Sequence, residues 1–171
     1  MAIVGLKLNN GETFELEVNS GDYVIDCGAN IGEVTTFFYS HGAYVLAKSS
    51  GIKKMFLHEH AERDQVTYST GSSIIEDKEN VNKNNYIEVE LVNLCEFLKL
   101  FNKKVKVLKI DIEGAEVELL NDLMDDDLIR DIPYVFVETH EKKIPSLRKS
   151  TATLKKRIEE ENYSNINLNW I

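Results

Sequence analysis

The feature that most constrains this chain lies at residues 24–32, which read Val-Ile-Asp-Cys-Gly-Ala-Asn-Ile-Gly. A short apolar run ends in Asp26, and glycines at positions 28 and 32 open a segment with helical periodicity. This pattern of a strand, an acid and a glycine turn is typical of parallel α/β folds that bind adenosine cofactors. In such folds a second acid, roughly 20 residues further on, binds the ribose hydroxyls. No Asp or Glu occurs from Val34 to His58, so the usual ribose ligand is missing.

The composition limits both the number of domains and the class of partner. The chain has 171 residues, of which 43% are hydrophobic, and this suffices for a single domain over residues 1–171. The formal net charge of -9 argues against nucleic acid or an anionic membrane surface as the main partner, because both attract clustered Lys and Arg. A small-molecule or neutral substrate fits this charge better.

The cysteines and the apolar runs bear on the compartment. Cys27 and Cys95 lie far apart in the sequence, and one of them falls inside the glycine loop, so we expect free thiols in a reducing environment. We find no pattern of a signal peptide in the first twenty residues and no apolar run long enough to cross a membrane. These features predict a cytoplasmic protein.

Apolar periodicity predicts alternating strands and helices. Residues 3–8 and 13–18 alternate around Asn-Asn-Gly-Glu and predict a β-hairpin within residues 1–20. Further strands are expected at residues 23–27, 43–47, 52–57, 86–91, 105–112, 134–137 and 166–171. Helices are expected at residues 31–41, 94–101, 114–124 and 151–161. The alternation predicts a three-layer α/β/α sandwich that binds ligands at the carboxyl ends of its strands.

Two connections depart from this alternation. Lys-Ser-Ser-Gly at residues 48–51 leaves no room for a helix between the strands at 43–47 and 52–57. Residues 58–85 are polar with little periodicity, and we expect a mobile loop there. This loop either covers the functional site or is only solvated.

Acidic residues follow three of the predicted strands. Asp26 ends the first, Asp111 and Glu113 end another, and Glu138 with His140 ends a third. Neighbouring strands of a parallel sheet lie about 4.8 Å apart, and their carboxyl ends share one crevice. We therefore expect these groups to converge on one ligand.

Four segments together resemble a known family. "VIDCGANIG", "VLKIDIEGAEVELL", "VFVETH" and the terminal "NLNWI" are similar to the FkbM-type branch of S-adenosylmethionine-dependent methyltransferases. The resemblance covers roughly residues 20 to 171. It implies a Rossmann-like class I methyltransferase fold with seven strands, and O-methylation of a hydroxyl on a sugar, polyketide or other small molecule.

The resemblance also assigns roles at the cofactor end. Asp26, Gly28, Asn30 and Gly32 would line the methionine and ribose end of S-adenosylmethionine, and Asp111 would lie near the methyl group and the incoming hydroxyl. The structural alternatives are a turn role alone for Gly28 and Gly32, a helix cap at Asn30 and, for Asp111, burial as an acceptor of backbone hydrogen bonds.

Glu138 and His140 are the residues expected to contact the acceptor or take its proton, since an imidazole with an ordinary pKa of about 6.5 suits that work. An exposed loop histidine is the alternative. Glu113 and Glu116 flank a helix start, where carboxylates favour the helix dipole. We expect nothing further of Glu116 and leave Glu113 open.

No metal is expected. The methyl group of the cofactor is already activated, so the chemistry asks mainly for placement and a proton acceptor. The spacing of His58, Glu59 and His60 is similar to that of a metal-binding pair, but the pattern supplies no third convergent ligand.

The chain departs from the family at its second strand. "HGAYV" passes directly into "LAKSSGIKKMFLH", as if the start of strand two were joined to the end of strand three with the intervening helix missing. Glu59, the first acid after the gap, could replace the ribose ligand only if the loop folds back. A shortened sheet also exposes an edge that a second copy of the chain could cover.

Two other functions remain open. A degenerate, non-catalytic domain for binding or assembly would explain the deletion, whereas the retained acids favour an enzyme. A nicotinamide dehydrogenase fits less well, because Asn30 stands where the dinucleotide fingerprint has its second glycine.

Overall fold

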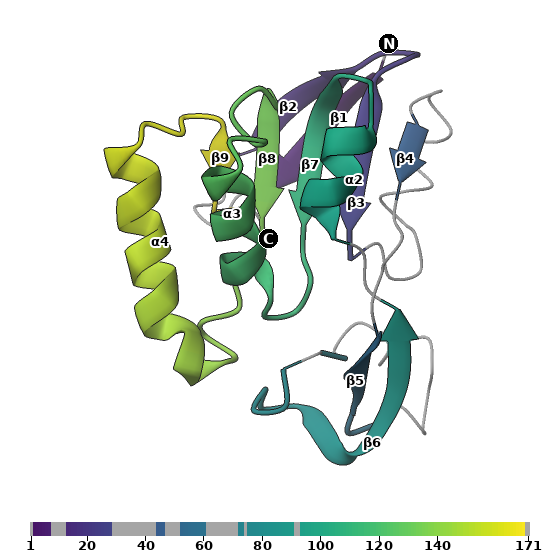
Figure 1. Cartoon of the computed structure of the whole chain (residues 1–171), viewed down its shortest axis with the longest axis vertical. Coiled ribbons are helices and arrows are strands. Elements are labelled where there is room, and N and C mark those ends of the chain that lie inside the picture. The colour runs from purple at the N-terminus through teal and green to yellow at the C-terminus, as the bar shows by residue number, and fades with distance from the viewer. Residues whose placement is uncertain are drawn as a thin grey trace.

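A five-stranded parallel sheet forms the centre of the computed structural model, which describes residues 2–7, 13–28, 44–46, 52–60, 72–73, 75–90 and 93–169 (Figure 1). The strand order is β4 (Tyr44–Leu46), β3 (Tyr23–Cys27), β7 (Val105–Ile110), β8 (Tyr134–Val137) and β9 (Ile166–Asn167). Every neighbouring pair is parallel. The predicted parallel sheet is thus confirmed, but with five strands in the described part of the chain rather than the seven that the resemblance implied.

Helices cover one face of this sheet. They are α2 (Leu94–Leu100), α3 (Glu116–Asp125) and α4 (Arg148–Glu160), the last preceded by the 3-10 helix η2 (Pro145–Leu147). Their apolar side chains share a buried cluster with alternate residues of β3, β7 and β8. None of these helices is both long and apolar enough to cross a membrane.

The N-terminal hairpin covers the opposite face. As predicted, β1 (Ala2–Lys7) and β2 (Thr13–Val18) pair antiparallel, but they form a separate two-stranded sheet. Phe14 packs edge-on against Tyr134 and Phe136 of β8, at centroid distances of 5.8 and 5.5 Å. Figure 1 shows the hairpin behind the central sheet and the helices in front of it. The helix expected at residues 31–41 lies outside the described residues, so the third layer seen here is a hairpin.

Two element boundaries shift at the carboxyl end of β7. The strand ends at Ile110 rather than residue 112, and α3 begins at Glu116 rather than Gly114. Glu113 has a φ of 56° and Gly114 a φ of 119°, and neither value is compatible with a strand or a right-handed helix. A short irregular loop therefore carries Asp111 and Glu113.

A third sheet replaces part of the predicted loop. β5 (Ile52–His58) pairs antiparallel with β6 (Val81–Glu90) and not with the central sheet, so our interpretation of residues 52–57 as a remnant of strand three was wrong. Residues 81–85 are strand as well, although their Asn and Lys side chains are poor strand formers. These side chains are exposed or half-buried, so backbone pairing with β5 decides their conformation. Figure 1 shows this sheet beyond the carboxyl ends of β3 and β7.

Candidate active site

The candidate site lies where the chain changes direction in the sheet. From β3 the chain leads to β4 on one side and later returns to β7 on the other. In open parallel sheets, ligands bind outside the carboxyl ends of strands at such a switch point. Here the backbone N–H of Asp111 donates to the carbonyl of Cys27 over 3.0 Å, which holds the two strand ends together.

Gly28 is required at this switch point by the fold itself. Its φ is +88°, a value that other residues rarely adopt. A Cβ atom at this position would overlap the carbonyl group of Asp111. Gly28 therefore forms the turn, which is the structural alternative that the sequence analysis gave for it. This holds whether or not the residue also approaches a ligand.

A buried lysine joins the two strand ends. Lys109 is 6% exposed, and its Nζ lies 3.0 Å from Oδ1 of Asp26, 3.6 Å from Oδ2 of Asp111 and 3.1 Å from the carbonyl oxygen of Gly28. The Asp26 side chain is completely buried. The sequence analysis overlooked Lys109, although a lysine inside the apolar strand Val-Lys-Val-Leu-Lys-Ile and two positions before Asp111 was a usable signal.

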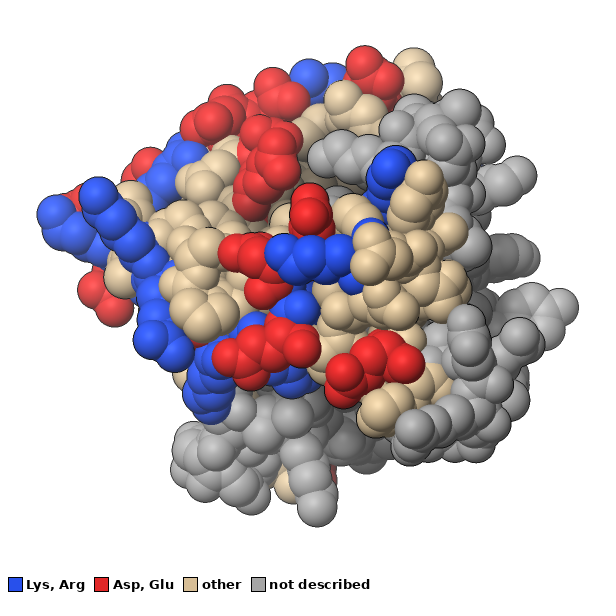
Figure 2. All heavy atoms as spheres, turned by 90° about the horizontal axis from the view of Figure 1, so that it is seen from below, with Lys and Arg blue, Asp and Glu red and all other residues tan. Residues whose placement is uncertain are grey.

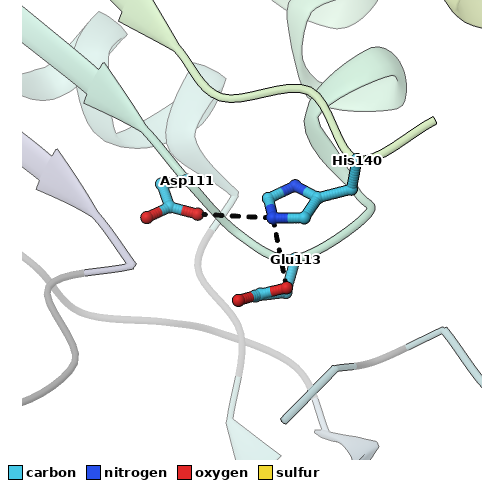
Figure 3. A group of neighbouring side chains, drawn as sticks. All are labelled: Asp111, Glu113 and His140. Atoms are coloured by element: carbon cyan, nitrogen blue, oxygen red, sulfur yellow. Dashed lines mark ion pairs between the residues drawn. The ribbon is translucent and has the colours of Figure 1, made fainter. Parts of the chain in front are cut away.

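His140 forms the centre of the acidic cluster. It is 2% exposed, so the alternative of an exposed loop histidine is wrong. Its Nε2 lies 3.1 Å from Glu113 Oε2, 3.6 Å from Glu138 Oε1 and 3.8 Å from Asp111 Oδ1. Its Nδ1 lies 2.9 Å from Glu116 Oε1. Figure 3 shows the imidazole between Asp111 and Glu113. Acids that follow different strands thus meet at one edge of the sheet.

Glu116 has a structural role that the sequence did not reveal. The expectation that it serves only the helix dipole was wrong, because its side chain is completely buried. Its carboxylate accepts hydrogen bonds from the backbone N–H groups of Ile112, at 3.1 Å, and Gly114, at 3.0 Å. Ala115, which precedes α3, makes no side-chain capping bond. Glu116 therefore orders the loop before its own helix and also binds His140.

These contacts change the protonation states of the cluster. Burial alone would lower the pKa of His140, but its bonds to Glu113 and Glu116 outweigh burial and raise this pKa to about 10. Burial would likewise raise the pKa of Glu113, yet the bonds from His140 and Lys78 lower it to about 2. His140 therefore carries a proton at neutral pH, unlike the unperturbed imidazole that the sequence suggested.

Asp111 is shifted in the other direction. Burial raises its pKa, the cation of Lys109 opposes this rise, and the negative charges of Glu138 and Glu113 add to it. The Asp111 side chain is 24% exposed, so solvent or a ligand can reach it. It is thus an accessible carboxylate with more proton affinity than an ordinary aspartate.

The segment before β6 closes one side of the cluster. Lys78 is 3% exposed, and its Nζ lies 2.5 Å from Glu113 Oε2. The Ser73 hydroxyl donates to the backbone carbonyl of Glu113. A Cβ atom at Gly114 would lie only 2.8 Å from Cγ1 of Ile75. Ser73, Ile75 and Lys78 therefore cover this end of the site, so this described part of the predicted loop does lie over the site. No local pattern distinguishes Lys78 from the solvated lysines near it.

Among the described residues, Asp111, Glu113 and His140 form a group that could bind a metal ion. Each offers one potential ligand atom, and these three atoms lie within 4.8 Å of one another. The buried ammonium of Lys78 and the proton on His140 already neutralise much of this negative charge. This arrangement is an ion-pair network. Figure 2 shows acidic and basic side chains intermixed on the face of the molecule at this end.

The remaining predicted residues lie elsewhere. His58 and His60 have ring centroids 5.6 Å apart, and Glu59 lies 3.8 Å from His60, all at the end of β5. The metal-ligand group found among described residues includes none of the three. Asn30 and Gly32 fall outside the residues that the structure describes.

Comparison with known proteins gives one match. A family model described as the Methyltransferase FkbM domain matches residues 26–164. No curated protein and no solved structure matches the chain significantly. The matched span begins at Asp26 and includes Lys109, Asp111 and His140, so the whole acidic cluster lies inside it.

Proposed function

The chain belongs to the FkbM methyltransferase family, and we propose that it transfers a methyl group from S-adenosylmethionine to a hydroxyl of a small molecule or sugar. The observation that carries this proposal is that the family match spans the acids that meet at the switch point between β3 and β7. Folds of this topology bind their ligands at that place.

The residues at the switch point suit such a cofactor. S-adenosylmethionine would supply an activated methyl group on a sulfonium cation. In the described part of this region the carboxylates outnumber the cations, so the local charge favours a cation; the carboxylates are Asp26, Asp111, Glu113, Glu116 and Glu138, and the cations are Lys78, Lys109, Lys143 and the protonated His140. Asp26, Gly28 and Asp111 would border the cofactor, with Asn30 and Gly32 further along the same loop.

A missing ribose ligand should weaken this site. β4 ends at Leu46, and the next acid in the chain is Glu59, which lies 3.8 Å from His60 in the turn after β5. Loss of a bidentate carboxylate would reduce the binding free energy by about 1.5 to 3 kcal/mol. We therefore propose that the chain is shortened at its second strand and binds its cofactor weakly.

Asp111 and Glu138 are the groups best suited to take the proton of the acceptor hydroxyl. Both side chains are partly accessible, at 24% and 26% exposure, and both lie within 4 Å of His140. Since His140 already carries a proton at neutral pH and its side chain is almost completely buried, its role in this proposal is to hold the two carboxylates, and the predicted contact with the acceptor passes to Asp111 and Glu138. The acceptor hydroxyl would approach along the edge that the cluster borders.

The second candidate is a binding or assembly domain that has lost catalysis. The observation in its favour is the stretch from Val34 to His58 without any acid. Such a domain would keep the fold and the ion-pair network but would not turn over a methyl donor.

Calorimetric titration with S-adenosylmethionine and S-adenosylhomocysteine tests the proposal. We expect binding by the wild type and weaker binding by Asp26→Asn and Asp111→Asn. Asp131→Asn is the control, because Asp131 is an exposed acid just before β8, at the opposite end of the sheet. The absence of heat at millimolar ligand would exclude the enzyme and favour the binding domain.

Turnover is measured with a methyl-labelled donor and a panel of sugars and hydroxylated small molecules. If Asp111 takes the proton, Asp111→Asn lowers the rate by about 10²- to 10⁴-fold. A rate equal to that of Asp131→Asn would remove Asp111 from the reaction.

A further inference from the structure

Lys109 occupies a position between the cofactor loop and the candidate proton acceptor. We propose that it is a positioning residue, whose ammonium group holds the turn after β3 and the Asp111 carboxylate in one arrangement and keeps Asp111 ionised. This inference rests on the proposed function and adds to it a residue to which neither the family match nor the sequence motif assigns a role.

The sheet register explains how one side chain reaches both strand ends. Lys109 pairs with Asp26 across the β3–β7 ladder, and residues paired in this way place their side chains on the same face. Asp111 lies two positions after Lys109 in the chain. An ammonium group has three N–H donors, and the described oxygen atoms near that of Lys109 include Asp26 Oδ1, the Gly28 carbonyl and Asp111 Oδ2. Backbone and side chains from both strand ends therefore meet at one cation.

The charges show what removal of this cation would do. Asp26 is fully buried and Asp111 is 24% exposed, and among the described residues Lys109 is a cation within 4 Å of both carboxylates. Without it, two like charges would share a site of low dielectric constant, which favours uptake of a proton by one of them. Asp111, the more exposed of the two, can be followed in titration.

Other charged groups also face Asp111 and must be held constant. Glu113 lies in the same loop, and Glu138 and His140 reach it from the segment after β8. A substitution at Lys109 leaves all three in place. The change in the titration of Asp111 between wild type and variant thus reports on the lysine.

Lys106 provides a matched control on the same strand. Its Nζ lies 2.6 Å from Oδ2 of Asp22, at the opposite end of the sheet, and both side chains are 24% exposed. Lys106→Met removes a lysine–aspartate pair from β7 without touching the switch point.

The experiment compares wild type with Lys109→Met, Lys109→Arg and Lys106→Met. The pKa of Asp111 is measured by carboxyl ¹³C NMR, and the pH dependence of kcat/KM is measured with the methyl-labelled donor. We expect Lys109→Met to raise the pKa of Asp111, to move the acidic limb of the rate profile upward by the same amount and to lower kcat/KM at pH 7 at least tenfold. Lys109→Arg keeps the charge and should restore the pKa, and Lys106→Met should change neither.

The outcomes separate this inference from the proposed function. An unchanged pKa of Asp111 in folded Lys109→Met would overturn the inference, even if the wild type methylates its acceptor. If the wild type binds no S-adenosylmethionine, the proposed function is wrong, and Lys109 has no positioning role in it. The NMR titration would still show whether Lys109 keeps Asp111 ionised. If Lys109→Met does not fold, Lys109→Gln removes the charge, retains a hydrogen-bond donor and decides by the same two measurements.

Discussion

Oε1 of Glu116 lies 2.9 Å from Nδ1 of His140, and both side chains are almost completely excluded from solvent. The first residue of α3 thereby binds a residue that follows β8. The same carboxylate accepts the backbone N–H groups of Ile112 and Gly114. One buried acid thus connects the loop after β7 with the segment after β8, and these are the two segments that carry the candidate proton acceptors.

Substitution of Glu116 should destabilise the whole domain. Glu116→Gln leaves the buried imidazolium of His140 without one of its counter-charges, and loss of one partner from a buried pair lowers the free energy of unfolding by about 3–5 kcal/mol. Urea denaturation measures this change. Glu118→Gln is the control, because Glu118 is an exposed acid in the same first turn of α3, and its effect should stay within about 0.5 kcal/mol. Equal effects of the two substitutions would mean that the buried pair contributes nothing.

The stability of the protein should decrease at alkaline pH. The pKa of His140 rises from 6.5 in the unfolded chain to about 10 in the folded one, so the proton is bound more tightly by the native state. The resulting stabilisation is fully present below about pH 6.5 and is lost as the pH rises to 10. Urea denaturation at several pH values should show this decline in the wild type. The difference between wild type and His140→Gln isolates it, and a difference that stays constant from pH 6.5 to 10 would contradict the raised pKa.

Gly28→Ala should be far more damaging than Gly21→Ala. Both glycines have positive φ, of +88° and +92°, so both alanines carry the penalty of the left-handed region, about 1–2 kcal/mol. Among the described residues other than its chain neighbours, no atom lies within 4 Å of a Cβ at Gly21, whereas a Cβ at Gly28 overlaps the Asp111 carbonyl. We expect Gly21→Ala to fold with a modestly lower melting temperature and Gly28→Ala to lose several kcal/mol more. Similar melting temperatures of the two variants would show that the ends of β3 and β7 can move apart at little cost in stability.

Lys78→Met should release the segment before β6 from the site. The substitution removes a buried cation from Glu113, so residues 75–78 lose their charged attachment and their amide hydrogens should exchange faster. Lys83→Met is the control, because Lys83 pairs with Glu76 at 3.8 Å between two largely exposed side chains. Hydrogen exchange measured by mass spectrometry reports both variants. Unchanged protection of residues 75–78 in Lys78→Met would show that the ion pair between Lys78 and Glu113 does not hold this segment in place.

Local patterns in the sequence determined much of the framework. The alternating segments around residues 9–12 predicted the hairpin, and the apolar runs predicted the strands of the central sheet. Asn93 accepts a hydrogen bond from the backbone N–H of Glu96, so α2 begins with its own cap. The acids after β3, β7 and β8 could be expected at one edge, because parallel strands present their carboxyl ends together.

Tertiary structure decided where β5 pairs and which charged side chains are buried. A short strand such as β5 has the same pattern whether it joins the central sheet or pairs with β6, because the choice depends on a partner strand distant in the sequence. Burial of Lys78, Lys109 and Glu116 depends likewise on counter-charges from other elements. Residue types and spacing therefore identified the family and the acids of the site. The proton on His140 and the cation between Asp26 and Asp111 emerge only when the strand ends are brought together, because a buried charge is stable only beside its partner.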